Sequence, residues 1–370
     1  MGRRMRGVKK KVFEVAAVAV IVILLVFAAG CSGDLLGYIK YLFQGAVIDL
    51  PRTGQTTCYE PGDDGDLQMG VAWPGPRFTD NSNGTITDNL TGLIWLKDST
   101  RFGQRTWADA LSDCNNLAHD GINLTDGSSA GDWRLPNRKE LGSLVNYEAG
   151  WVSDWLNGQG FTGLGYENYW SSTTDASSTT SAWYVYMYSG AVKPTSKGED
   201  PPVLYVLAVR SGQAGGAVSL PRTGQTASYV SGDDGDLKKG AAWPDPRFTD
   251  IGNGTICDNL TGLMWEQAPS GASDWVGALS YANNLDLGGH SDWRLPNVNE
   301  LKILINAAEG NFAGWLNDHG FSGVQTSNYW SSTTWAATPT SAWYVHMGYG
   351  EVWVNPKGLS YYVLAVRGGQ

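Results

Sequence analysis

Cysteine, histidine and charged residues are all scarce in this chain of 370 residues. It holds four cysteines and four histidines, and only 17% of its residues are charged. The histidines have no metal-type spacing and fall at unmatched positions, so we predict neither a metal centre nor a nucleophile–base pair. We therefore expect no enzyme activity and no cofactor, because the many serines and threonines alone do not indicate catalysis.

Positive charge is also in short supply. The formal net charge is −10, and removal of a basic N-terminal leader would bring it to about −15. Such a surface repels polyanions, so nucleic acid and strongly sulfated polymers are poor general ligands.

The cysteines do not form a repeated disulfide framework. Cys58 and Cys114 could pair with each other, or both could stay reduced, and the sequence leaves these alternatives open. We expect Cys257 to be a small buried apolar residue. Packing must therefore hold the fold together.

What the chain does have is a tandem duplication. The motif Leu-Pro-Arg-Thr-Gly-Gln-Thr begins at Leu50 and again at Leu220, an offset of 170, and Asp-Trp-Arg-Leu-Pro-Asn begins at Asp132 and again at Asp292, an offset of 160. The unit is too long for a solenoid repeat. We predict two globular domains, copy 1 (residues 48–212) and copy 2 (residues 213–370), each folding independently.

The N-terminal sequence predicts an export signal. Six lysines and arginines precede residues 15–29, an uncharged apolar stretch too short for an ordinary membrane span. The sequence Ala-Ala-Gly-Cys that ends at Cys31 resembles a bacterial lipobox. The resemblance implies a lipoprotein signal peptide (1–30), acylation of Cys31, a tether (31–47) and a location in the cell envelope, with Ser32 favouring the outer membrane; an uncleaved membrane anchor is the alternative.

Local patterns predict an α+β unit. Asn83-Gly84 indicates a two-residue hairpin turn, and Thr106 should cap a helix over residues 107–117 whose apolar residues fall on one face. Asn137 should cap a second short helix. Strands are expected at residues 91–96, 169–173, 182–187 and 205–210, giving two helices followed by an antiparallel sheet.

The combined motifs resemble the Lcl C-terminal domain family, named for the C-terminal domain of a bacterial collagen-like surface adhesin. They are Asn-Gly-Thr-Ile-Thr-Asp-Asn-Leu-Thr-Gly-Leu-Ile-Trp before residue 96, Asp-Trp-Arg-Leu-Pro-Asn at 132–137 and Tyr-Trp-Ser-Ser-Thr at 169–173. More remotely they resemble C-type-lectin-like and formylglycine-generating-enzyme-like domains. The resemblance implies a small sheet that presents ligand-binding loops, and a family disulfide that Ala208 and Ala365 do not support.

Residues that both copies share are expected to be scaffold. Four tryptophan pairs are predicted to be core, and Arg134 with Glu140, like Arg294 with Glu300, should tie a loop to the second helix. The repeated acidic turns could hold calcium, although we favour turn and cap roles for them. The tryptophan pairs are Trp95/Trp265, Trp133/Trp293, Trp170/Trp330 and Trp183/Trp343, and the acidic residues are Asp63, Asp64, Asp66, Asp233, Asp234 and Asp236.

Aromatic residues that only one copy has are the predicted ligand contacts. Trp335 and Trp353 stand where copy 1 has Asp175 and Lys193, so we expect both rings to be exposed. The other candidates are Tyr186, Tyr188 and Tyr349. Flat exposed rings stack on sugar faces.

These patterns favour a lipid-anchored binding or adhesion protein of the cell envelope. Its partners would be the membrane, through the N-terminal lipid, and an extracellular glycan, surface polymer or envelope protein. The alternative is a structural envelope lipoprotein without a small ligand.

Overall fold

The computed structural model describes residues 48–198, 203–212 and 215–368. The predicted signal peptide, the tether and Cys31 lie outside these residues. Within the described ranges, no helix has both the length and the apolar character needed to cross a membrane.

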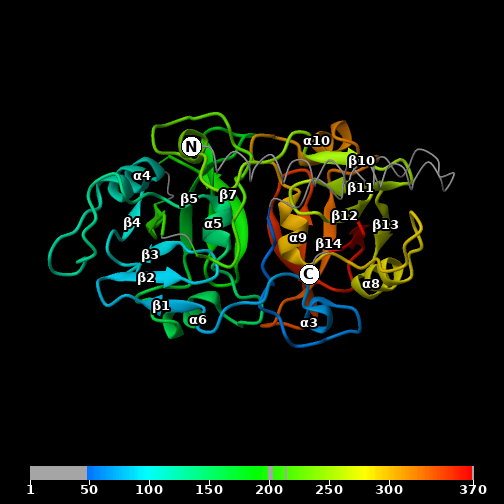
Figure 1. The fold of residues 1–370 in the computed structure, drawn as a ribbon, viewed down its shortest axis with the longest axis horizontal. Coiled ribbons are helices and arrows are strands. Elements are labelled where there is room, and N and C mark those ends of the chain that lie inside the picture. Colours follow the sequence, from blue (N-terminus) through cyan, green and yellow to red (C-terminus); the bar gives the residue numbers. More distant parts are fainter. Residues whose placement is uncertain (1–47, 199–202, 213–214, 369–370) are drawn as a thin grey trace, which may run out of the picture. The chain divides into compact units, whose positions relative to one another are not determined.

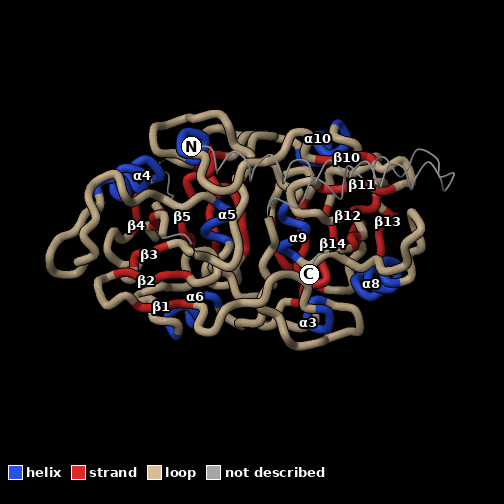
Figure 2. The backbone as a smooth tube through the Cα atoms, viewed as in Figure 1, coloured by secondary structure: helices blue, strands red, loops and turns tan. Residues whose placement is uncertain are grey.

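The helices and strands are short, and long loops connect them (Figure 2). In copy 1 they are α3 (Asp64–Leu67), β1 (Phe78–Asp80), β2 (Thr85–Asp88), β3 (Ile94–Leu96), β4 (Gln104–Arg105), α4 (Trp107–Asn116), α5 (Arg138–Gly142), α6 (Val152–Gly158), β5 (Asn168–Thr174), β6 (Ser181–Tyr186), β7 (Ala191–Ser196), β8 (Leu204–Tyr205) and β9 (Val209–Arg210). In copy 2 they are α7 (Asp234–Leu237), β10 (Phe248–Asp250), β11 (Thr255–Asp258), β12 (Met264–Glu266), β13 (Ser270–Ser273), α8 (Trp275–Asn283), α9 (Val298–Ile303), α10 (Phe312–Asp318), β14 (Asn328–Thr334), β15 (Ser341–His346), β16 (Val352–Pro356), β17 (Tyr361–Val363) and β18 (Val366–Arg367).

Both predicted helices of copy 1 begin at the expected caps. The Thr106 side chain accepts a hydrogen bond from the backbone N–H of Asp109, and α4 buries its apolar face. Asn137 and Glu140 form a capping box at the start of α5. The coarse α+β class, with mainly antiparallel sheets, is confirmed.

Three local predictions were wrong. The β1–β2 hairpin has a four-residue loop, 81–84, in which Ser82 and Gly84 adopt positive φ; Asn83 instead accepts hydrogen bonds from Thr85. The strand expected at 205–210 is divided into β8 and β9, which pair in different sheets. The helices α3 and α6 were not predicted, because a four-residue helix carries no periodicity and glycines interrupt the pattern around α6.

The strands of the described residues form three sheets. In copy 1 β1, β2, β3 and β9 make a four-stranded sheet, and copy 2 repeats it with β10, β11, β12 and β18. The other ten strands form one sheet, in the order β13-β17-β14-β15-β16-β7-β6-β5-β8-β4. Each copy contributes five neighbouring strands to it, and the copies meet where β7 pairs with β16 (Figure 1).

A local two-fold axis relates the copies at this meeting point. The antiparallel register places Val192 opposite Val352, and these residues are equivalent at the offset of 160. Pairing of equivalent residues is the mark of an isologous contact, as in a symmetric dimer. The duplicated chain is thus built like a dimer whose two subunits are covalently joined.

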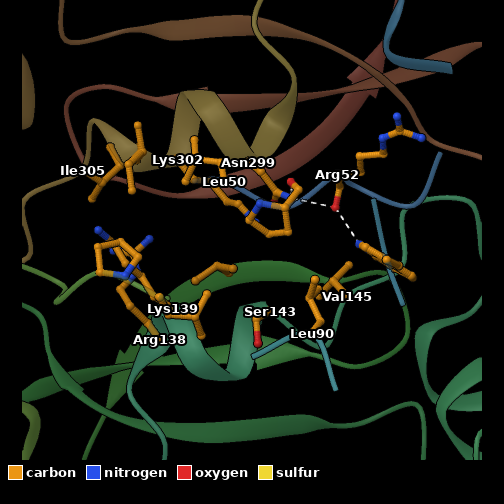
Figure 3. A pocket seen from close by; sticks show the side chains of 17 residues that line it. Leu50, Arg52, Leu90, Arg138, Lys139, Ser143, Val145, Asn299, Lys302 and Ile305 are labelled. Carbon is orange, nitrogen blue, oxygen red and sulfur yellow. Dashed lines mark hydrogen bonds between the residues drawn. The ribbon is translucent and has the colours of Figure 1, made fainter. Parts of the chain in front are cut away.

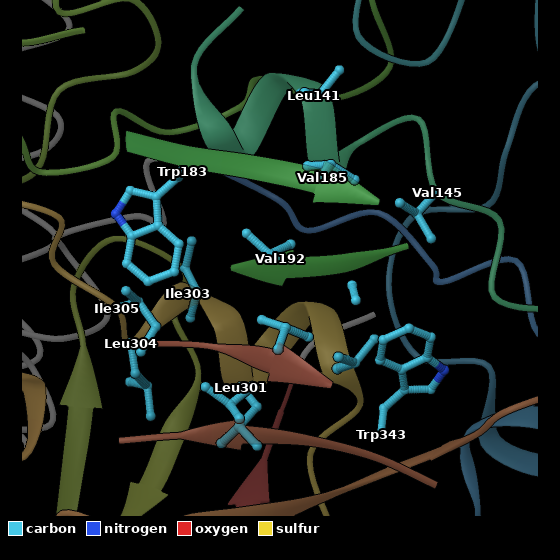
Figure 4. Packing of buried hydrophobic residues seen from close by; sticks show 14 of the residues in the cluster. Leu141, Val145, Trp183, Val185, Val192, Leu301, Ile303, Leu304, Ile305 and Trp343 are labelled. Atoms are coloured by element: carbon cyan, nitrogen blue, oxygen red, sulfur yellow. The ribbon is translucent and has the colours of Figure 1, made fainter. Parts of the chain in front are cut away.

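The largest core cluster belongs to both copies. Trp183, Val185 and Val192 of copy 1 and Trp343 and Val352 of copy 2 are all buried members of it. Figure 4 shows Trp183 and Val192 of copy 1 facing Ile303 of copy 2 across the joint. Beside this shared cluster each copy has a smaller core cluster of its own, which includes Trp107 and Trp133 in copy 1 and Trp275 and Trp293 in copy 2. Both copies lie in one compact unit.

Each copy also sends an N-terminal arm to the other. Arm 1 (residues 48–72) places α3 against β14 of copy 2, and arm 2 (residues 218–242) places α7 against β5 of copy 1 (Figure 1). The arms start alike: the Ile48 N–H donates to Leu260 O, and the Val218 N–H donates to Leu90 O.

Two side chains on each arm make the exchange specific. The Gln55 amide donates to Thr334 O at 2.8 Å and accepts from its N–H at 3.0 Å, as a strand would. Gln225 makes the same pair of bonds with Thr174. Because Thr334 and Thr174 are buried in the shared sheet, each glutamine satisfies two backbone groups that would otherwise lack partners.

Candidate binding site

The shared tryptophans and the Arg–Glu pairs are structural, as predicted. All eight tryptophans are buried, at 2% exposure or less. Arg134 and Glu140 lie 2.6 Å apart, as do Arg294 and Glu300, with both partners buried. Each pair also holds the capping asparagine of the second helix through the glutamate. These residues position loops, and their polar groups are engaged in structural contacts.

The repeated acidic turns act as caps and interior contacts. Asp63 accepts hydrogen bonds from the N–H groups of Tyr59 and Asp66, and Asp66 accepts from Gly62; Asp233 and Asp236 repeat this pattern. Among the described residues, no three His, Cys, Asp or Glu side chains gather in a way that could hold a metal ion.

Asp64 and Asp234 lie inside the exchanged arms. The Asp64 carboxylate accepts from Thr53 of its own arm and from Thr333 of copy 2, both at 2.7 Å. Asp234 bonds Thr223 and Thr173 in the same way. Burial raises the pKa of Asp64 to about 7 and that of Asp234 to about 6, because a charged carboxylate is poorly solvated there.

Trp335 and Trp353 are half-buried and pack against the shared core, so the open exposure we expected of them is not observed. The Lys193 ammonium lies 3.7 Å from the centre of a Trp353 ring. These two residues are equivalents that meet at the two-fold axis. Two lysines would repel each other there and two tryptophans would crowd, so one of each makes a cation–π contact.

Tyr186 and Tyr188 belong to a group of four aromatic side chains, the aromatic corner. The Trp151 and Tyr188 rings stack at 4.3 Å, and Tyr186 stacks on Tyr188 at 5.5 Å. Tyr166, which is 48% exposed, meets both Trp151 and Tyr188 edge-on. The other three rings are half-buried, so the corner presents a broad aromatic surface.

Acidic oxygens border the corner. The Tyr166 hydroxyl donates to the Asp154 carboxylate at 2.7 Å, and this bond raises the pKa of the tyrosine. Both Asp154 and the neighbouring Glu167 are exposed. The corner therefore combines flat rings with acceptors that can receive hydrogen bonds from hydroxyl groups.

Backbone hydrogen bonds hold the three loops of the corner together. Ser153 at the start of α6 donates to Met187 O at 2.8 Å, and Met187 donates to Glu167 O at 2.9 Å. Copy 2 has the same two bonds between Ala313, Met347 and Ser327. The scaffold of the corner is thus common to both copies.

The side chains on that scaffold differ completely. In copy 2 an imidazole replaces one of the four rings, and small or polar uncharged residues replace the other three rings and the two bordering carboxylates. Trp151, Asp154, Tyr166, Glu167, Tyr186 and Tyr188 correspond to Asn311, Gly314, Thr326, Ser327, His346 and Gly348. Copy 2 instead has Tyr349, which is 63% exposed and stacks on His346 at 4.6 Å. Copy 1 has Ser189 in its place.

The sequence analysis missed Trp151, Asp154 and Tyr166. The signal was available, because these positions differ between the copies as Tyr188 does. The structure brings all three segments to one place.

The cysteines of the described residues are free thiols. Cys58 is exposed on arm 1, whereas Cys114 is buried in α4, so of the two open alternatives the structure has the unpaired one. Cys257 is buried, as predicted.

Comparison with known proteins identifies the family. No curated protein matches the chain significantly. The profile of the Lcl C-terminal domain matches residues 84–210 and again residues 254–367, which together are more than half of the chain. Both arms lie before the matched ranges, so the exchange is made by residues outside them. The chain belongs to the Lcl C-terminal domain family and carries two copies of that domain in tandem.

Proposed function

We propose that this protein is a cell-envelope binding or adhesion protein, and that the aromatic corner of copy 1 binds a glycan. The observation that supports it is the contrast between the copies: one loop scaffold carries four clustered aromatic rings in copy 1, whereas copy 2 has only the stacked pair His346 and Tyr349 there. Partly exposed rings gain binding free energy when they stack on the apolar face of a sugar.

The charge of the corner narrows the ligand class. Asp154 and Glu167 accept hydrogen bonds from hydroxyl or amino groups, but they repel sulfate and carboxylate groups. The overall negative charge acts in the same direction. The proposed ligand is therefore a neutral or amino-bearing glycan.

The corner supports binding without catalysis. Its titratable groups are carboxylates and phenols, and the Asp154 carboxylate is held by the Tyr166 hydroxyl, which suits a role in positioning a ligand. The C-type-lectin-like classification is part of the same proposal: short helices and long loops lie over a small sheet, and the loops carry the binding residues.

The proposal includes a lipid anchor at Cys31 and a place in the bacterial cell envelope. It rests on the basic leader, the apolar stretch and the small residues before the cysteine. Mass spectrometry of the mature N-terminus should find an acylated Cys31. A Cys31→Ser protein that stays membrane-bound and unprocessed would favour an uncleaved anchor.

A glycan array with the purified full chain tests the ligand. Copy 2 supplies the replacements, so Trp151→Asn with Tyr166→Thr should weaken binding by about tenfold or more, since a stacked ring contributes about 1 kcal/mol. Tyr349→Ser, which gives copy 2 the residue of copy 1, is the matched control and should bind normally. A folded protein that binds no glycan would favour the alternative of a structural envelope lipoprotein.

A further inference from the structure

A small cavity, partly open to solvent, lies at the joint between the copies and shares no lining residue with the aromatic corner. Its volume is ≈ 80 Å³, and residues of α5, α9, β7 and both arms line it. Leu50 of arm 1 and Leu220 of arm 2 are equivalents that both reach it, so the cavity lies beside the local two-fold axis. Figure 3 shows Arg138 and Lys139 on α5 and Lys302 on α9 bordering it from two sides.

Four cationic side chains line this cavity. Arg52 recurs in copy 2 as Arg222 and is held by Gly70 O and Gln68, whereas Arg138, Lys139 and Lys302 each occur in one copy only. Among the described residues, no carboxylate lies within 4 Å of the charged nitrogens of Arg138, Lys139 or Lys302. Asp175 and Asp234 lie in electrostatic range of Arg138, but Ser177 hydrogen-bonds the first and two threonines bond the second.

Several donors of these cations remain available. Lys139 Nζ donates to Arg222 O at 3.1 Å, and Lys302 Nζ donates to the Tyr147 hydroxyl at 2.9 Å. Because an ammonium group has three N–H donors, each lysine has donors left for a ligand. Arg138 is only 7% exposed; its Nη2 donates to Gly350 O, but its Nη1 is buried with no hydrogen-bond partner.

Burial makes this arrangement costly. It lowers the pKa of Lys302 to about 7 and lowers that of Lys139 well below its usual range. Aromatic rings partly compensate these cations: Arg138 lies 3.8 Å from a Trp183 ring centre, and Lys139 and Lys302 each lie 5.1 Å from a ring of Trp243 and Tyr147, respectively. A ligand carboxylate would stabilise the three cations further.

Comparison of the copies shows that these cations are no part of the common scaffold. Arg138, Lys139 and Lys302 correspond to Val298, Asn299 and Gly142. The same two helices therefore form in each copy with uncharged residues at these positions. The three charges are specific to the joint.

The remaining walls are mostly aliphatic. They include Leu50, Leu90, Val145, Val192, Ile303 and Ile305. A fully hydrated inorganic ion would gain nothing from these walls, whereas a hydrocarbon group would be removed from water there.

We propose that the cavity binds a small organic anion, a monocarboxylate with a short hydrocarbon chain, whose carboxylate pairs with these cations while its chain packs on the aliphatic wall. This site is independent of the aromatic corner. The ligand would hold the two copies together, because it touches both.

Calorimetry and thermal unfolding of the purified full chain with hexanoate test this proposal. Hexanoate should bind saturably and raise Tm, since a ligand that binds only the folded state stabilises it. Hexanol lacks the charge, and inorganic phosphate lacks the chain, so each should bind at least about tenfold more weakly than hexanoate.

Variants locate the site. Lys302→Met and Lys139→Asn should each weaken hexanoate binding by about tenfold. Lys97→Gln removes a surface charge and supplies the residue that copy 2 has, and it should leave binding unchanged. Lys302→Met keeps an aliphatic side chain of similar length. The Tm of this variant without ligand shows whether it folds.

Three results would overturn the proposal. Equal affinity for hexanol would show an apolar cavity without anion recognition. Equal affinity for phosphate would show a site that ignores the hydrocarbon wall. Unchanged hexanoate binding by a folded Lys302→Met, Lys139→Asn double variant would place any bound anion elsewhere. Loss of glycan binding in the Trp151→Asn, Tyr166→Thr protein has no bearing on these outcomes.

Discussion

The two copies have the same scaffold, and three of the places where they differ carry most of the argument about function. Caps, Arg–Glu pairs and core tryptophans repeat at the expected offsets. The differences discussed above gather in the aromatic corner, in the cavity at the joint and at the Lys193–Trp353 contact.

The difference at the Lys193–Trp353 contact has a structural cause. Lys193 and Trp353 differ because equivalent residues meet at a two-fold axis, where complementary partners pack better than identical ones. That difference needs no ligand. The aromatic corner lies on surface loops, and the cavity gathers charges of one sign, so this explanation does not extend to either.

The largest expected effect comes from separating the copies. Residues 48–212 alone would expose the apolar face that packs on copy 2 and would lose arm 2, so we expect no cooperative unfolding transition from either half. Circular dichroism during heating, with the full chain as the control, measures this. A half that melts cooperatively near the Tm of the full chain would contradict a shared core.

Gln225→Ala tests one side of the arm exchange. It removes three buried hydrogen bonds, the longest of them to Ala307 O at 3.4 Å, and leaves the N–H and C=O of Thr174 without partners, so the free energy of unfolding should fall by about 2–4 kcal/mol. Chemical denaturation measures it. Gln55→Ala should act equally on the other side, and Ser231→Ala, a change on arm 2 itself, is the control. Unequal effects would show that one arm is dispensable.

The buried aspartates should make stability depend on pH. Their folded-state pKa values, about 7 for Asp64 and about 6 for Asp234, lie above the ordinary 3.8, so the folded state binds more protons between these values. This stabilisation is fully present below about pH 4 and falls as pH rises towards 7, by on the order of 5 kcal/mol, because one pKa unit corresponds to about 1.4 kcal/mol.

Asp64→Asn with Asp234→Asn should flatten this profile, because an amide keeps the shape of the protonated acid without titrating. Chemical denaturation at several pH values compares the two proteins. The change of an exposed residue, Asp318→Asn, serves as the control. An unchanged slope in the double variant would assign the pH dependence to other groups.

The smallest effect is expected at the two-fold axis. Lys193→Met removes the cation over Trp353 and should cost about 1 kcal/mol of stability. Trp353→Lys, which makes the joint symmetric, should cost more, because two ammonium groups would meet. Neither change should alter glycan binding, and a loss of binding with unchanged stability would return Trp353 to the ligand site.

Local rules predicted the parts of this protein well. Thr106 and Asn137 cap their helices because their oxygens bond nearby N–H groups, and such contacts depend on a few neighbouring residues. The paired tryptophans were assigned to the core from their place in apolar runs. Half of the corner, Tyr186 and Tyr188, followed from comparing the copies.

Only the tertiary structure decided how the copies combine. Nothing local in Gln55 or Asp64 indicates that their partners are Thr334 and Thr333 of the other copy, since either copy offers a chemically equal strand. The repeat, the caps and the core residues were determined by the sequence, because short-range hydrogen bonds and apolar patterning specify them. The exchanged arms, the continuous sheet and the cationic cavity depend on which of two equivalent surfaces each segment contacts. Only the tertiary packing determines this.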